Sequence, residues 1–167
     1  MAKIYKFPSS EGVSIMSISI FDVANTFLNT EAMSHKKLQK LCYYAQAWHL
    51  ALFDEPLFDS QFQAWVHGPV CPELYAHYRE FGWQTIPSVE IIPDEINQAP
   101  DKLKLIELIY RTYGVLDGDQ LEMLTHSETP WINERKGLDP WNSSNNPINQ
   151  DEMRKFYLAE FEKSQNN

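Results

Sequence analysis

The segment over residues 34–53 constrains the fold most. Its apolar side chains recur at spacings of three and four, which is typical of a helix with one face against a core. Ser34 is placed to cap the start of this helix, and Pro56 cannot continue it. We therefore expect a long central helix, whose core-facing stripe comprises Leu38, Leu41, Ala45, Trp48 and Leu52.

The other faces of this helix carry polar and aromatic residues. One line consists of Gln39, Tyr43 and Gln46, and the flanks of the apolar stripe carry further basic and aromatic side chains. Two interpretations remain open for the tyrosines, which either fill the boundary between core and water or contact a partner. The flanking residues are Lys37, Lys40, Tyr44 and Ala47.

Composition limits the class of partner. The chain has 167 residues, of which 43% are hydrophobic, so a single domain can bury a sizeable core. Its formal net charge is −9, which repels a phosphate backbone and attracts a basic protein surface. Only Cys42 and Cys71 are cysteines, and no apolar run predicts a signal peptide or a membrane span. We expect a cytoplasmic protein that binds neither membrane nor nucleic acid.

The first half of the chain predicts an extension, two helices, a strand and a third helix. Residues 1–16 read as an N-terminal extension, and a first helix is expected over residues 19–30, antiparallel to the central one. Alternating residues over 62–67 predict a strand that stops at a turn formed by Gly68 and Pro69. Pro72 then opens a helix that Gly82 closes. Residues 83–92 form either a second short strand or a packed loop.

The second half is expected to be helical. A helix from Pro100 to Gly114 carries apolar residues around most of its circumference, so we expect it to be buried. Short helices are predicted after Asp117 and Thr129, and a last helix follows the polar loop over residues 139–149. The fold class is therefore mainly α, a compact helical domain around a long central helix, with one or two short β-strands before a Gly-Pro turn. Residues 165–167 read as a disordered tail.

Catalytic and metal-binding patterns are weak. His35, Cys42 and His49 share a line of the central helix, but seven-residue steps separate neighbours by about 10 Å, too far for one metal ion. The adjacent residues His126, Ser127 and Glu128 seldom point at a common atom, so a capping role is the better interpretation. The sequence also lacks a phosphate-binding glycine loop and common hydrolase motifs. We expect no enzyme, no metal and no cofactor.

Three ordered stretches resemble a known family. They are DVANTFL at residues 22–28, KLQKLCYYAQAWHL at 37–50 and FQAWVHGPVCPELY at 62–75. This set is similar to the Panacea domain, the family of SocA-like antitoxins and phage-associated GepA-like proteins. The resemblance spans residues 17–164, and its later matching positions are Gly114, Leu121, Leu124, Thr125, His126, Pro130 and Trp131.

The resemblance implies an antitoxin of a toxin–antitoxin system, which binds and neutralises a protein toxin encoded by a neighbouring gene. Two alternatives remain: an adaptor that delivers the toxin to a cellular protease, and a hydrolase that removes a toxic product and uses His67 and His126. The extra residues 1–16 depart from the family pattern. They either help to recognise the toxin or precede a translation start at Met16.

The residues around the central helix flank and the strand–turn–helix unit are the candidates for partner contact. The acidic net charge suits a basic toxin surface, and the aromatic residues suit a protein interface. The predicted contact residues are Lys40, Tyr44, Trp65, His67, Pro69, Val70 and Tyr75. Positions expected to shape the fold are Leu38, Leu41, Trp48, Gly68, Pro72, Pro130 and Trp131.

Overall fold

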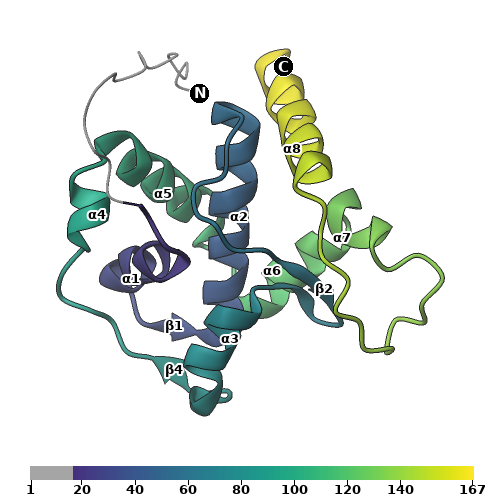
Figure 1. Ribbon diagram of the computed structural model, residues 1–167, viewed down its shortest axis with the longest axis horizontal. Helices are drawn as coiled ribbons and strands as arrows, with labels where there is room; N and C mark the ends of the chain where they lie inside the picture. The colour runs from purple at the N-terminus through teal and green to yellow at the C-terminus, as the bar shows by residue number, and fades with distance from the viewer. Residues whose placement is uncertain (1–16) are drawn as a thin grey trace.

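The helix expected over residues 34–53 forms and occupies the centre of the molecule (Figure 1). The computed structural model describes residues 17–167, so the extension over residues 1–16 lies outside it. Helix α2 (His35–Phe53) begins after Ser34, whose hydroxyl accepts a hydrogen bond from the Lys37 amide at 3.2 Å. It ends at Asp54, which adopts a left-handed conformation with φ of 58°.

Burial of α2 extends well beyond the predicted stripe. The expectation of a single core-facing side was wrong, because the polar residues Gln39, Lys40 and Gln46 are buried as well. The Gln39 side chain pairs with the backbone of Cys71, and the Gln46 side chain bonds the Leu57 amide and the Phe58 carbonyl. These two side-chain amides join neighbouring loops to the helix. Their hydrogen bonds offset the free-energy cost of burying polar groups.

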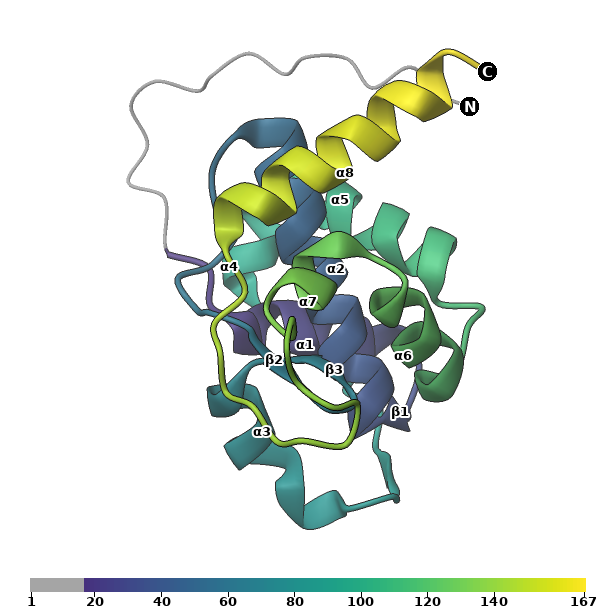
Figure 2. The same ribbon diagram turned by 90° about the vertical axis from the view of Figure 1, so that its right-hand side faces the viewer.

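The other helices surround α2 on two sides (Figures 1 and 2). On one side lie α1 (Ile20–Thr30), α4 (Asp94–Asn97) and α5 (Pro100–Tyr113). On the other lie α6 (Gly118–His126), α7 (Thr129–Asn133) and α8 (Gln150–Gln165), with α8 crossing α2 obliquely. The mainly helical prediction is confirmed for the described residues.

Local sequence signals explain several of these helix ends. A reciprocal capping box joins Ser19 to Asp22 at α1, and another joins Asp117 to Gln120 at α6. Asn149 caps α8 by accepting a hydrogen bond from the Glu152 amide. The last helix runs through Gln165, so it includes the first residue assigned to the tail.

Helix α5 is amphipathic, which corrects the expectation of a helix buried around most of its circumference. One face is exposed and includes Glu107, Leu108 and Arg111. The inward residues Leu105, Ile106, Ile109 and Tyr113 are buried. Counting apolar residues overestimated the burial because α5 packs on the outside of α2 and has core on one side.

The strand expected over residues 62–67 is half of a hairpin. Strands β2 (Gln63–Trp65) and β3 (Gly68–Val70) pair antiparallel, with Trp65 opposite Gly68. The turn therefore consists of Val66 and His67, and the prediction of a Gly-Pro turn was wrong by two residues. Gly68 is the first residue of the return strand β3. Its φ is 102°, a conformation that favours glycine.

A second small sheet joins distant parts of the chain. Strand β1 (Met33–Ser34), which the sequence did not reveal, pairs with β4 (Thr85–Ile86).

Helix α3 (Pro72–Tyr78) continues as the 3₁₀ turn η1 (Arg79–Phe81) and closes at Gly82, as expected. The open question over residues 83–92 resolves into a short strand at 85–86, followed by a loop that bonds α1 through Val89 and Leu28.

Candidate functional site

A cleft of about 1070 Å³ opens beside the first turns of α2. The β2–β3 hairpin, α3 with η1, the start of α6 and the loop at residues 143–145 form its walls. Its size and its mixture of apolar and polar side chains are typical of a binding site. The lining residues are Ser34, His35, Lys36, Gln39, Lys40, Trp65, Val66, His67, Val70, Tyr75, Arg79, Gly82, Trp83, Asp117, Gly118, Asp119, Ser143, Ser144 and Asn145.

The cleft brings together most of the predicted contact residues. Two of them, Tyr44 and Pro69, are absent from its lining. Tyr44 is fully buried on the side of α2 that faces α8, and Pro69 is buried within the hairpin. Neither side chain is available to a partner in this conformation. The lining residues that the sequence predicted are Lys40, Trp65, His67, Val70 and Tyr75, of which Lys40 and Val70 are themselves buried.

Aromatic side chains form one wall of the cleft. The Tyr75 ring stacks on His35 with a centroid separation of 5.3 Å and meets the edge of Trp65 at 5.0 Å. Trp83, after η1, is 88% exposed. Burial lowers the pKa of His35 to about 4, so this histidine is a neutral ring at physiological pH. The wall therefore offers flat apolar surfaces that a partner can cover.

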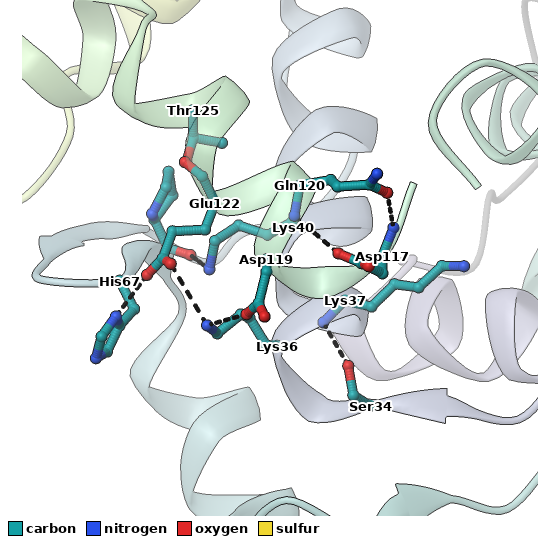
Figure 3. Close-up of polar contacts among 11 residues, drawn as sticks. Ser34, Lys36, Lys37, Lys40, His67, Asp117, Asp119, Gln120, Glu122 and Thr125 are labelled. Carbon is teal, nitrogen blue, oxygen red and sulfur yellow. Dashed lines mark hydrogen bonds and ion pairs between the residues drawn. The ribbon is translucent and has the colours of Figure 1, made fainter. Parts of the chain in front are cut away.

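Charged groups gather at the mouth of the cleft (Figure 3). Glu122 of α6 lies between Lys36 and His67, because its carboxylate contacts the Lys36 ammonium at 3.5 Å and the Nδ1 atom of His67. Lys36 also pairs with Asp119 at 2.8 Å, which lowers the pKa of that exposed carboxyl. The Nδ1 atom of His67 contacts Glu122, and the His67 side chain is 61% exposed, so its Nε2 atom is available to a partner.

Lys40 lies beneath this charged group in an enclosed position. Its ammonium donates to the Pro69 carbonyl at 3.2 Å, and no carboxylate among residues 17–167 forms an ion pair with it. Burial lowers the pKa of Lys40 to about 7, although the charge of Glu122 acts in the opposite direction. A Cβ on Gly68 would stand 2.6 Å from Lys40 Cε, so the hairpin closes tightly over this lysine.

The three adjacent residues considered for catalysis go to separate places. His126 stacks on Trp131 with a centroid separation of 3.9 Å, and burial lowers its pKa. Ser127 donates to the Leu124 carbonyl at the end of α6, which fits a capping role. Glu128 accepts hydrogen bonds from Tyr44 of α2 and Tyr157 of α8. These residues therefore do not form a triad.

The residues expected to shape the fold lie in the core, at the starts of elements or in contacts between elements. Leu38 and Leu41 are fully buried, Pro72 and Pro130 stand at the starts of α3 and α7, and Gly68 opens β3. The Trp131 indole donates to the Trp65 carbonyl at 2.9 Å, which holds the hairpin in place. The Trp48 indole donates to the Tyr113 hydroxyl at 2.8 Å.

A closed group of tyrosines surrounds Glu128, away from the cleft. The Glu128 carboxylate accepts hydrogen bonds from Tyr44 at 2.7 Å and Tyr157 at 2.9 Å, and Tyr44 stacks on Tyr113 at 4.0 Å. Burial raises the pKa of Glu128 to about 7, although the two hydroxyl donors oppose the shift. We call Glu128, Tyr43, Tyr44, Tyr113 and Tyr157 the tyrosine cluster.

Sequence reasoning missed the acidic and cationic residues of the mouth, Lys36, Asp119 and Glu122. Asp119 and Glu122 come from α6, more than eighty positions after Lys36, so their meeting is a tertiary effect without a local signal. Among residues 17–167, no three His, Cys, Asp or Glu side chains gather in a way that could hold a metal ion. No helix in the same range is both long and apolar enough to span a bilayer.

Comparison with known proteins assigns the family. Residues 38–132 match the family described as Antitoxin SocA-like, Panacea domain. The chain belongs to this family. A curated member, Antitoxin SocA of Caulobacter vibrioides (strain NA1000 / CB15N), is 30% identical over 130 residues, which cover 69% of each chain. No solved structure matches the chain. The resemblance seen in the sequence is thus confirmed, and the Panacea match includes the hairpin, α3 and α6 of the cleft.

Proposed function

We propose that this protein is an antitoxin that neutralises a cognate protein toxin by direct binding at the cleft, in the cytoplasm. Family membership supports the antitoxin role. The observation that carries the binding surface is the meeting of three predicted contact residues with accessible side chains, Trp65, His67 and Tyr75, in one open cleft with an aromatic wall. Trp, Tyr and Arg residues dominate the binding energy of many interfaces, and all three types line this cleft.

Charge supports a basic partner. The chain carries a net charge of −9, and the carboxylates of Asp117 and Asp119 lie at the mouth of the cleft. Asp119 keeps one side open to solvent, with its side chain 84% exposed, so it can also face a cation on a partner. Complementary charge accelerates encounter and selects partners. We therefore propose that the toxin surface at this cleft is basic and includes apolar groups that cover the aromatic wall.

Co-expression with the neighbouring gene product tests this proposal. Wild-type antitoxin should restore growth and co-purify with the toxin as a stable complex. Tyr75→Ala should weaken the complex about tenfold or more, since it removes an aromatic ring that is 41% exposed in the cleft. Leu108→Ala is the matched control, because Leu108 is 38% exposed but lies on α5, outside the lining of the cleft.

The melting temperature of each variant separates binding from folding, because Tyr75 also packs on His35 and Trp65. A Tyr75→Ala protein that is folded and still binds at wild-type affinity would contradict the cleft as the binding surface. Equal losses in Tyr75→Ala and Leu108→Ala would do so as well.

The same experiment distinguishes the two alternatives. If the protein is a protease adaptor, rescue should require an active protease, and the toxin should be degraded faster when the antitoxin is present. If it is a hydrolase, rescue should occur without a stable complex and should be lost in His67→Ala, which removes the exposed imidazole at the mouth of the cleft. Rescue in protease-deficient cells with an intact complex supports neutralisation by binding.

A further inference from the structure

A buried arginine fixes the loop that follows α7. Arg135 is only 6% exposed, and its guanidinium donates to the backbone carbonyls of Ala64 at 2.9 Å and Asn142 at 2.6 Å. Longer bonds reach the carbonyls of Asp139 and Pro140. The guanidinium also lies over the Trp131 ring at 5.2 Å. Arg135 therefore ties three residues of the loop to the β2–β3 hairpin.

The partners of this guanidinium are neutral, because no carboxylate among residues 17–167 forms an ion pair with Arg135. Burying a charge is costly unless its hydrogen-bonding groups are satisfied, and here loop carbonyls satisfy them. The rigid fork of an arginine holds several acceptors at fixed positions, which a flexible lysine cannot do. This arrangement gives the loop a defined conformation although it contains no regular secondary structure.

The fixed loop presents an exposed tryptophan. Trp141 is 83% exposed and stands between Pro140 and Asn142, whose carbonyls both accept from Arg135. Two residues later, the loop becomes a wall of the cleft at residues 143–145. Figure 2 shows the loop passing in front of the hairpin and toward α3. An exposed indole on a fixed backbone is suited to binding, because little conformational entropy is lost when a partner covers it.

We propose that Trp141 is a second anchor for the toxin, which inserts into an apolar pocket on the toxin surface, and that Arg135 is a positioning residue for it. This inference rests on the proposed function, since it extends the contact surface from the cleft onto the adjoining loop. The loop segment over residues 134–142 contains two acids and two bases. Its contribution is therefore apolar rather than electrostatic, in contrast to the mouth of the cleft.

The position of the loop in the chain points to a role in specificity. The Panacea match ends at residue 132, so Arg135 and Trp141 lie beyond it, whereas most of the cleft lies within it. A contact outside this matched stretch is a place where recognition of one particular toxin can be set without changing the stretch itself.

Binding measurements on the full chain with the purified product of the neighbouring toxin gene test this inference. Trp141→Ala should raise the Kd at least about thirtyfold, the effect of a hot-spot aromatic residue, and Trp141→Phe should recover part of the loss. Ile91→Ala is the matched control, because Ile91 is 76% exposed on the loop between β4 and α4. Its Kd should stay within about twofold of the wild type.

Arg135→Lys tests the positioning role. Lysine keeps the charge but cannot hold the separated carbonyls together, so amide hydrogen exchange at residues 138–142 should accelerate while the helices stay protected. The Kd should rise by about tenfold, and adding Trp141→Ala to Arg135→Lys should cost less than Trp141→Ala alone. Fast exchange in the loop with unchanged affinity would overturn the positioning role.

The outcomes separate this inference from the proposed function. If the wild type forms no complex with the toxin, the proposed function fails. If the wild type binds, Tyr75→Ala weakens binding and Trp141→Ala does not, then only the second anchor is overturned. If Trp141→Ala converts a self-associated free chain into a monomer without changing toxin affinity, the indole joins copies of this chain, which also overturns the inference.

Discussion

Two glutamates near each other in the chain have opposite surroundings. Glu128 is enclosed in the tyrosine cluster and accepts hydrogen bonds from the neutral hydroxyls of Tyr44 and Tyr157. Glu122 lies at the mouth of the cleft and pairs with Lys36 and with the exposed His67. In the first arrangement the carboxylate is enclosed and its hydrogen bonds are made to other residues of the chain. The second is open and leaves groups available for a partner.

This difference separates scaffold from the proposed binding surface. Rings in the tyrosine cluster pack on one another, as Tyr44 and Tyr113 do at 4.0 Å, and they cannot reach a partner. The cleft instead leaves Trp83 and Tyr75 partly or largely exposed, although burying them would stabilise an isolated chain. We expect changes in the cluster to reduce stability and changes on the cleft wall to reduce binding.

Gly68→Ala should have the largest effect on stability. It tests whether the side chains around Lys40, beneath the mouth of the cleft, are packed as closely as those of the tyrosine cluster. The new Cβ would stand 2.6 Å from Lys40 Cε and 2.9 Å from Thr125 Oγ1, at a φ of 102°. Strain and overpacking together should destabilise the protein by about 4 kcal/mol, measured by denaturant unfolding. Gly137→Ala is the control: its φ is 82° but no atom crowds it, so it should cost about 1 kcal/mol. Similar costs would refute the packing argument.

The pH dependence of stability should identify the closed site. Burial raises the pKa of Glu128 from 4.5 to about 7, so the folded protein holds this proton more tightly than the unfolded chain does. The stabilising effect of the proton is complete below about pH 4.5 and is lost as the pH rises toward 7. Relative to Glu128→Gln, the wild type should lose at most about 3 kcal/mol between pH 4.5 and 8. A constant difference between the two unfolding curves over this range would contradict the prediction.

Tyr44→Phe should have a smaller effect on stability. It removes the donor 2.7 Å from the Glu128 carboxylate and leaves Tyr157 as the remaining hydroxyl donor. We expect a loss of about 1 to 2 kcal/mol at pH 7 and a smaller loss at pH 5, where protonation reduces the need for donors. Toxin affinity of the folded variant should remain unchanged. A large loss of affinity without a loss of stability would return Tyr44 to the contact residues predicted from sequence.

Trp83→Ala should change stability least. The side chain is 88% exposed, so its removal should alter the free energy of unfolding by less than about 0.5 kcal/mol. If the cleft wall binds the toxin, the Kd should nevertheless rise severalfold, as titration calorimetry can measure. Unchanged affinity would limit the contact surface to the inner part of the cleft.

The sequence predicted all the helices except the short α4, because their signals are local. Capping at Ser34 and at Asp117, the proline at position 72 and the apolar spacing of α2 all act within a few residues. The hairpin was half predicted, since the alternation over β2 is local. Its turn was misplaced because Gly68 and Pro69 are common turn residues, and they begin a strand here.

The candidate site was predicted in part for a related reason. Trp65, His67 and Tyr75 belong to one strand–turn–helix unit, so their proximity follows from a short stretch of chain. The burial of Tyr44 was not predicted, because periodicity cannot show that α8, more than a hundred residues later, covers that side of α2. Glu122 and Arg135 were missed because their partners, His67 and Ala64, come from far along the chain.

The enclosure of α2 affects how the protein unfolds. The loops at Cys71 and Phe58 are attached to it through Gln39 and Gln46, while Lys40 bonds the hairpin. If α2 unravels, the cleft and the tyrosine cluster lose their common support together. Unfolding should therefore be cooperative, without a long-lived species that keeps one region and loses the other. If the toxin binds at the cleft as proposed, it would then protect all the described elements, including distant α5, against unfolding and against proteolysis that requires unfolding.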